Sequence, residues 1–255
     1  MRGMNFSVLW IALAIAIFGY APAAEAQATR TWVSGVGDDA NPCSRTAPCK
    51  TFAGAISKTA ASGEINVMDP GGFGAVTITK AITIRSDHIE AGVLVAGTNG
   101  IVVSAGATDT VVLEGLDIDG TTTGLNGVSV TSGSQVYVIR CAIRRFSQNG
   151  INMASNTTNA RIFVLDSIVN LNGGGINVQG NGTPNLATVQ NTLFGSNVTF
   201  AAQANGAGNV LSFLNSQLRN SPQGLNLLNG ATASSIGPSN VVAGTGAFTS
   251  TTPFQ

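Results

Sequence analysis

The sequence predicts an all-β fold, a parallel β-helix in which each rung of the coil contributes three short strands. From Val111 onward the chain lines up with itself in blocks of about 25 residues, which start at Val111, Val136, Arg161, Leu186 and Val210. Each block holds three apolar patches in which apolar and polar residues alternate, which is the period of a strand. Short strands separated by turn residues at such a period indicate stacked rungs.

Two other architectures compete with the β-helix. A helix-pair solenoid is disfavoured because the blocks are rich in Gly, Asn, Thr and Val and lack the Leu, Ala, Glu and Lys runs that helices prefer. A β-sandwich with regularly spaced strands stays an alternative on strand spacing alone. The segments EINVMD, AVTITK, AITIRS, GVLVAG and GIVVSA extend the alternation upstream. About seven rungs at roughly 4.8 Å each would give a stack about 35 Å tall.

The beginning of the chain has the features of a secretory signal peptide. Arg2 precedes a short uncharged apolar run, and small residues then offer cleavage after Ala26 or after Ala28. A membrane anchor is the alternative, but the run is short for a span of about 20 residues. The predicted organisation is a signal peptide at 1–28, an N-terminal cap at 29–64, the β-helix at 65–245 and an irregular tail at 246–255.

Composition narrows the classes of partner. Twelve Lys and Arg balance twelve Asp and Glu, and no basic stripe is present, so nucleic acid is not an expected partner. No stable membrane insertion is expected once the signal is removed, and the protein is expected in the periplasm or outside the cell. After Asp166 the only charged residue is Arg219, so acid or base chemistry must draw mainly on residues 30–166. Nothing in the sequence indicates an oligomeric state.

The three cysteines divide into a close pair and a single residue. In an exported protein Cys43 and Cys49 are most simply a local disulfide, and a functional thiol pair is the alternative. Cys141 stands inside an apolar run, far in sequence from the only histidine, His88. A nucleophilic cysteine needs a base, so Cys141 is expected to be a small core residue.

The stretch from Trp32 to Ile84, with PCSRTAPCKTFAGAI at its centre, resembles the N-terminal entry of secreted right-handed β-helix proteins of the pectate-lyase-like superfamily. The resemblance implies a right-handed coil, entered through a capping helix at about 51–61 and a first strand at 65–68. The catalytic motifs of the superfamily's enzymes are not intact here. The sequence Gly37-Asp38-Asp39 spells a paired-acid motif, but it precedes the first rung and is interpreted as a turn. Whether the protein is an enzyme therefore stays open.

One charged cluster could still carry chemistry. Asp117 and Asp119 are expected to face outward, about 7 Å apart by strand geometry. A step of one repeat places Arg144 beside Asp119, with Arg145 nearby and Asp166 a rung further. Such a cluster could bind Ca²⁺ and orient an acidic sugar while an Arg removes a proton. The alternative is a ladder of surface ion pairs without function. No cofactor is expected otherwise.

A second candidate site is a row of polar side chains on the third strands. These residues are expected to face outward, where amides and hydroxyls could bind a glycan: Ser129, Asn152, Asn177, Thr199 and Asn226. A solvated face that keeps the sheet soluble is the alternative. Aromatic platforms are not expected to support such a site, because Tyr137, Phe146, Phe163 and Phe200 do not align at the repeat period.

The stretch LDSIVNLNGGGINVQGNG, residues 165–182, predicts how a rung is built. We expect Ile168, Ile176 and Val178 to fill the coil interior, and Asn170 to cap the stacked backbone at a turn. The sequence thus predicts a secreted β-helix protein that contacts extracellular or cell-surface polysaccharide, without intact catalytic motifs. The alternatives are a Ca²⁺-dependent lyase-like enzyme acting on acidic glycans and a structural or adhesin-like surface module.

Overall fold

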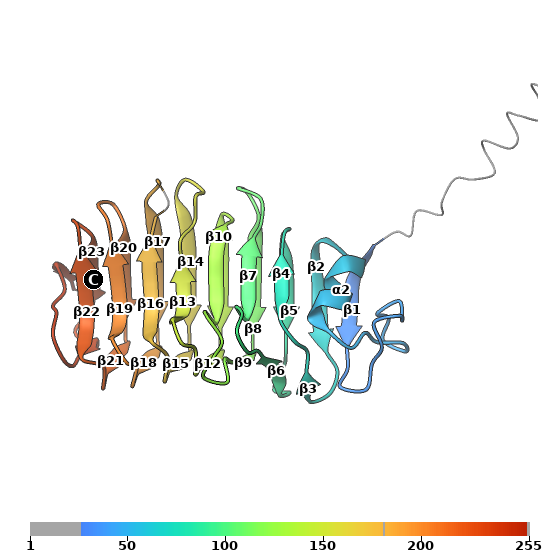
Figure 1. Ribbon diagram of the computed structural model, residues 1–255. Coiled ribbons are helices and arrows are strands. Elements are labelled where there is room, and N and C mark those ends of the chain that lie inside the picture. The colour runs from blue at the N-terminus through green and yellow to red at the C-terminus, as the bar shows by residue number, and fades with distance from the viewer. Residues whose placement is uncertain (1–26, 181, 254–255) are drawn as a thin grey trace, which may run out of the picture.

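The computed structural model describes residues 27–180 and 182–253, which form one elongated coil built from three parallel β-sheets (Figure 1). The coil makes about seven turns, as the sequence period predicts. Neighbouring strands in all three sheets pair in parallel. The signal-peptide prediction concerns residues that lie, except for the last two, outside the described part of the chain.

The strands of each sheet are stacked in chain order. The ten-stranded sheet contains β1 (Ala28–Val33), β2 (Thr59–Val67), β5 (Ile82–Arg85), β8 (Thr110–Glu114), β11 (Gln135–Ile139), β14 (Ala160–Leu165), β17 (Asn185–Gln190), β20 (Val210–Leu214), β23 (Thr232–Ile236) and β25 (Ser250–Thr252). The eight-stranded sheet contains β3 (Gly71–Gly72), β6 (Ala91–Leu94), β9 (Asp117–Asp119), β12 (Ala142–Arg144), β15 (Ile168–Asn170), β18 (Leu193–Gly195), β21 (Gln217–Arg219) and β24 (Val241–Val242). The seven-stranded sheet contains β4 (Val76–Ile78), β7 (Ile101–Ser104), β10 (Val128–Ser132), β13 (Asn149–Met153), β16 (Gly174–Gln179), β19 (Phe200–Asn205) and β22 (Gln223–Leu228).

Columns of apolar side chains fill the coil, one from each rung. In the eight-stranded sheet, for example, Ile118 pairs with Ile143, which pairs with Val169, and all three are fully buried. Ile176 and Val178 lie in the interior as predicted. Ile168, however, is 47% exposed, and the next residue, Val169, takes the inward position. The interior is therefore a continuous apolar core, held by burial on every rung.

The error at Ile168 has one cause, a rung that is slightly longer than its neighbours. Val136 pairs with Ile162, whereas the repeat alignment placed it opposite Arg161, the preceding residue. Because strand side chains alternate between two faces, a slip by a single position exchanges inside and outside. Ile168 consequently pairs with Ala142 on the outer face.

Left-handed residues turn the chain at the corner between the ten- and eight-stranded sheets. Arg140, Asp166, Asn191 and Asn215 all have φ between 48° and 51°, at equivalent positions of successive rungs. Asn tolerates this conformation better than most side chains, which explains its frequency at these corners.

Inside the coil, buried amides stack at the corner that leads to the seven-stranded sheet. Asn172 is fully buried, its Oδ1 accepts from Phe146 N at 3.0 Å, and its backbone N donates to Asn197 Oδ1 at 3.0 Å. The predicted capping role thus belongs to Asn172 and Asn197, whereas Asn170 is a half-exposed strand residue. The rung-to-rung ladder satisfies backbone groups that the turns leave unpaired.

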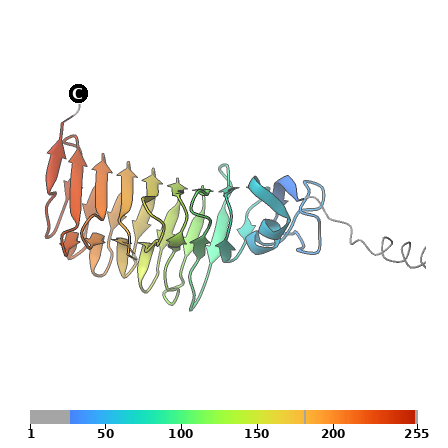
Figure 2. The same ribbon diagram turned by 90° about the horizontal axis from the view of Figure 1, so that it is seen from above.

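The N-terminal cap differs from its predicted boundaries. β1 already belongs to the ten-stranded sheet, so the coil begins inside the segment expected to be cap. The helix α2 (Phe52–Lys58) starts as predicted, with Thr51 Oγ1 accepting from Gly54 N at 2.9 Å, but it stops earlier because β2 begins at Thr59. Seen from above, the cap closes one end of a straight stack of rungs (Figure 2).

The C-terminal tail, predicted to be irregular, is irregular at 246–249 and forms a short strand at Ser250–Thr252. β25 adds a last strand to the ten-stranded sheet by pairing with β23. Phe248 packs on the fully buried Phe213 with ring centroids 5.7 Å apart. The tail therefore folds over the last rung and covers apolar surface that the end of the stack would expose.

Candidate functional site

A shallow groove runs over the outer face of the eight-stranded sheet near the N-terminal end, from β3 to β12. Its volume is about 550 Å³, and we call it the sheet groove. Its lining includes three glycines on β3 and β6, the exposed Leu94, and five charged residues: Glu90, Asp117, Asp119, Arg144 and Arg145. A Cβ at Gly72 would meet nothing within 4 Å, so the groove is open because side chains are missing there.

Asp119 lies at the centre of the charged residues. It pairs with Arg144 across neighbouring strands, as the repeat predicts. Its Oδ2 accepts from Arg144 Nε at 3.0 Å, its Oδ1 accepts from Arg145 Nε at 2.9 Å, and Arg145 Nη2 also bonds to Oδ2. Asp117 accepts from Arg144 at 2.7 Å. Four predicted residues therefore form one ion-pair network.

The network stabilises its charged state. Burial alone would raise the pKa of Asp119, but hydrogen bonds from Arg145 and Thr121 N and the charges of both arginines outweigh burial and lower this pKa below its ordinary value of 3.8. Hydrogen bonding to Asp117 raises the pKa of Arg144 despite its burial, and Asp119 raises the pKa of Arg145. An arginine held this firmly in its charged form is a poor general base.

The same contacts bear on the Ca²⁺ hypothesis. Calcium takes six to eight oxygen ligands, mainly carboxylates, carbonyls and waters. Both acids of the network already face arginines, and within the described residues no group of three or more His, Cys, Asp or Glu is placed to hold a metal. The residues of the sheet groove therefore do not fit a calcium site, and no calcium-dependent step follows from them.

Asp166 does not join the network. It is the left-handed residue at the corner before β15, where its carboxylate accepts from Asn191 Nδ2 at 3.0 Å. It shares the corner with Arg140, which pairs with Glu114 at 2.6 Å. The sequence argument placed Asp166 by rung number, but strand and corner positions of one rung face different directions.

The predicted polar row exists on the outer face of the seven-stranded sheet, with one member exchanged. Ser129, Asn152 and Asn177 are in register, but Gln203 occupies the next position and Thr199 does not. Thr199 precedes β19, where its hydroxyl donates to Gly173 O at 2.6 Å. The third strand of this rung starts later than the pattern suggested, which brings Gln203 opposite Asn177.

The amides of this row bind one another. Nδ2 of Asn177 donates to Oδ1 of Asn152 at 2.9 Å, Nε2 of Gln203 to Oδ1 of Asn177 at 3.0 Å, and Nδ2 of Asn226 to Oε1 of Gln203 at 2.6 Å. Ser129 and Asn177 are less than a tenth exposed. The row is therefore an axial ladder that ties rungs together, and burial leaves Ser129 and Asn177 little surface for contact with a ligand.

Aromatic residues also stack between rungs, which the repeat alignment missed. Tyr137 pairs with Phe163 in the ten-stranded sheet, and their rings are stacked with centroids 4.6 Å apart. The longer rung that moved Ile168 outward also brings this pair together. Each ring covers one face of the other, so the pair presents less open ring surface than two separate rings would.

The cysteine predictions are confirmed. Cys43 and Cys49 form a disulfide, with Cα atoms 4.6 Å apart. Cys141 is a free, buried thiol, and burial raises its pKa to about 11. A thiol that stays protonated at neutral pH is not a nucleophile.

Comparison with known proteins supports the architecture. No protein-family model and no curated protein matches the sequence. A crystal structure of pectate lyase Pel9A is similar, with a TM-score of 0.65 and 14% sequence identity, over 81% of this chain. The chain spans 62% of the length of that structure. The likeness shows the fold, a right-handed parallel β-helix.

Proposed function

We propose that this is a secreted carbohydrate-binding β-helix that contacts a neutral, hydroxyl-rich polysaccharide through the sheet groove and does not cleave it. The observation that carries the proposal is the fixed Asp119–Arg144–Arg145 network beside an open glycine floor. Charged groups that neighbours already hold in place can bind hydroxyls with little further loss of side-chain entropy.

The charge of the sheet groove favours a neutral glycan over an acidic one. Three acidic residues and two arginines line it, which leaves one net negative charge. A polyanion would be repelled, whereas sugar hydroxyls can both donate to carboxylates and accept from guanidinium groups. Leu94, 61% exposed, offers an apolar contact for the C–H groups of a sugar ring.

Secretion is part of the proposal. The Cys43–Cys49 disulfide supports an oxidising compartment. Within the described residues, no helix is sufficiently long and apolar to pass through a membrane. Mass spectrometry of the exported protein should find an N-terminus at Gln27 or at Thr29. An exported chain that retains residues 1–26 would contradict signal removal.

The binding experiment is a glycan array probed with the purified mature protein, followed by titration of the best neutral oligosaccharide. Gly72→Leu should weaken binding about tenfold or more, because the new side chain fills open space in the groove. Thr77→Leu, on an exposed position of the seven-stranded sheet, is the matched control and should bind as the wild type does.

Three results would overturn the proposal. They are the absence of any neutral glycan on the array, unchanged binding by Gly72→Leu, and the release of unsaturated products from acidic polysaccharides in the presence of Ca²⁺. If such cleavage occurred and Asp119→Ala abolished it, the lyase-like alternative would replace the binding function.

A further inference from the structure

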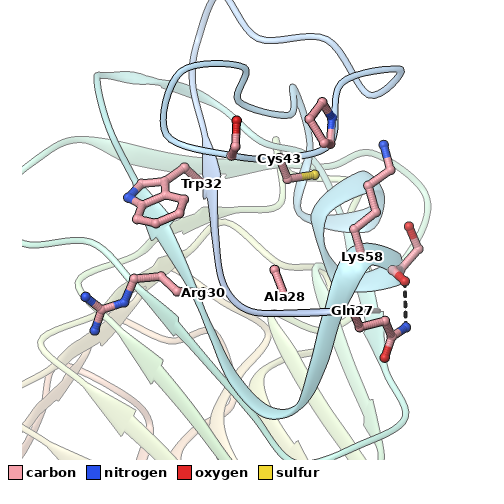
Figure 3. Close-up of a pocket in the computed structure, with 9 residues that line it drawn as sticks. Gln27, Ala28, Arg30, Trp32, Cys43 and Lys58 are labelled. Atoms are coloured by element: carbon pink, nitrogen blue, oxygen red, sulfur yellow. Dashed lines mark hydrogen bonds between the residues drawn. The ribbon is translucent and has the colours of Figure 1, made fainter. Parts of the chain in front are cut away.

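The cap contains a second hollow, about as large as the sheet groove and outside every site that the sequence suggested. Its volume is about 570 Å³, and we call it the cap hollow. It is lined by β1, the disulfide loop and the end of α2, through Gln27, Ala28, Arg30, Trp32, Pro42, Cys43, Ser44, Ser57 and Lys58. Figure 3 shows Trp32 and Arg30 on one side of β1, with Gln27 and Lys58 on the other.

Trp32 is held in place by the disulfide loop. Its backbone N donates to Cys43 O at 2.9 Å, and its O accepts from Cys49 N at 3.0 Å, so both ends of the loop bind this one residue. The indole itself is half-buried. Because the backbone of Trp32 is held, only the side-chain torsions of this residue lose freedom when a ligand stacks on the indole.

The cap hollow is positively charged. Arg30 and Lys58 line it, and none of the described residues in its lining is acidic. The side chain of Arg30 is 60% exposed, and its contact with Glu64 is long, at 3.5 Å. The amine of Lys58 donates to the carbonyl oxygens of Asp39 and Asn41, which hold it in position, and the carboxylate of Asp39, which interacts with this amine, lies outside the lining. The sheet groove, in contrast, has a net negative charge.

The backbone of β1 adds further groups. Strand alternation points the N–H and C=O of Arg30 to the same side as those of Trp32, away from β2. Those of Trp32 bind the disulfide loop, whereas those of Arg30 make no backbone hydrogen bond to the described residues outside the pairing of β1 with β2. The hydroxyls of Ser44 and Ser57 lie in the same lining.

We propose that the cap hollow binds an acidic saccharide, one whose sugar ring carries a carboxylate. Trp32 packs against the C–H face of the ring, Arg30 and Lys58 attract the carboxylate, and the backbone of Arg30 binds hydroxyls. A sugar is favoured over an extended peptide, because the disulfide loop occupies the edge of β1 at Trp32 and leaves too short a free edge for strand addition. This site does not depend on the sheet groove.

The test uses the protein that begins at Gln27, which keeps the whole lining, and intrinsic fluorescence, because Trp32 is then its only tryptophan. The mature protein is titrated with a glucuronate-containing tetrasaccharide, with the same tetrasaccharide after reduction of its carboxyl groups, and with an acidic peptide. We expect the acidic sugar to change the Trp32 emission, and the carboxyl-reduced sugar to bind about tenfold more weakly or worse.

Two variants complete the experiment. Arg30→Gln should weaken binding of the acidic sugar about tenfold, whereas Arg45→Gln, an exposed residue of the disulfide loop that does not line the hollow, should not. Gly72→Leu should leave this titration unchanged, which separates the cap hollow from the sheet groove. The proposal is overturned by a lack of emission change, by equal binding of the reduced sugar or of the acidic peptide, or by equal losses in the two arginine variants.

Discussion

The N-terminal and C-terminal halves of the coil stack their rungs in the same three parallel sheets, but among the described residues only the N-terminal half adds ion pairs to the amide contacts between rungs. Every ion pair found in the described residues lies between residues 30 and 145. Beyond Asp166, amide and hydroxyl ladders take their place, as in the chain of contacts through Asn172, Asn197 and Ser221. Rungs with and without charges stack equally well, so ion pairs are not a requirement of the fold.

The difference indicates where ligands should be sought. Uncharged ladders satisfy backbone groups at each corner and suffice to hold the C-terminal rungs. Seven charged residues of the N-terminal half line the two hollows, two in the cap hollow and five in the sheet groove. Both proposed ligand sites use these charges, and the variants below test how much the stability of the fold depends on them.

The largest effect is expected in the uncharged half. Asn172→Ala should lower the free energy of unfolding by about 3 kcal/mol, because the buried N–H of Phe146 would lose its acceptor and a cavity would form. Urea denaturation measures it. Asn170→Ala, a half-exposed neighbour on β15, should change stability by less than about 0.5 kcal/mol. Equal effects would contradict the assignment of the ladder to Asn172.

A slightly smaller effect is expected for Asp119→Asn, about 2 kcal/mol at neutral pH, since both arginines lose a charged partner. The lowered pKa of Asp119 means that its stabilisation is present above about pH 4, the pKa in the unfolded chain, and is lost as pH falls through the folded value. Denaturation at several acidic pH values should therefore show that stability falls less steeply with decreasing pH in the variant than in the wild type. Asp166→Asn, on the corner outside the network, is the control and should lower stability at neutral pH by less than about 0.5 kcal/mol.

Loss of the disulfide should affect the cap alone. Replacing Cys43 and Cys49 by Ser removes the cross-link that closes a short loop and should lower the free energy of unfolding by about 2 kcal/mol. Because the loop holds Trp32, its emission should shift toward that of an exposed indole. Cys141→Ala leaves this loop intact, and the same emission change in that variant would argue against the link between the disulfide and Trp32.

The smallest effect is expected in the amide row of the seven-stranded sheet. Gln203→Ala removes contacts to Asn177 and Asn226, but water can replace them on this outer face, so about 0.5–1 kcal/mol should be lost. Thr199→Ala, outside the row, should cost less. If Thr199→Ala lost more stability in thermal unfolding than Gln203→Ala, the result would contradict the assignment of Gln203 to the row.

The sequence was informative wherever equivalent positions of successive repeats carry side chains of the same kind or are separated by the regular period. Period and alternation predicted three parallel sheets, and a step of one repeat placed Arg144 beside Asp119. The same arithmetic failed where a rung was longer than its neighbours. There Ile168 moved to the surface and Tyr137 met Phe163. Thr199 failed for another reason, because it precedes β19 and Gln203 holds the position opposite Asn177.

The sequence by itself therefore determined the architecture, because burial of alternate apolar residues on every rung leaves few other ways to fold a chain with this period. It also identified the disulfide pair and four of the five charged candidates as neighbours. Only the tertiary structure decided register, because an inserted residue can be absorbed at any corner and only packing fixes which one. The cap hollow likewise forms only where β1, the disulfide loop and α2 pack together, and no local pattern in their sequences predicts that they do.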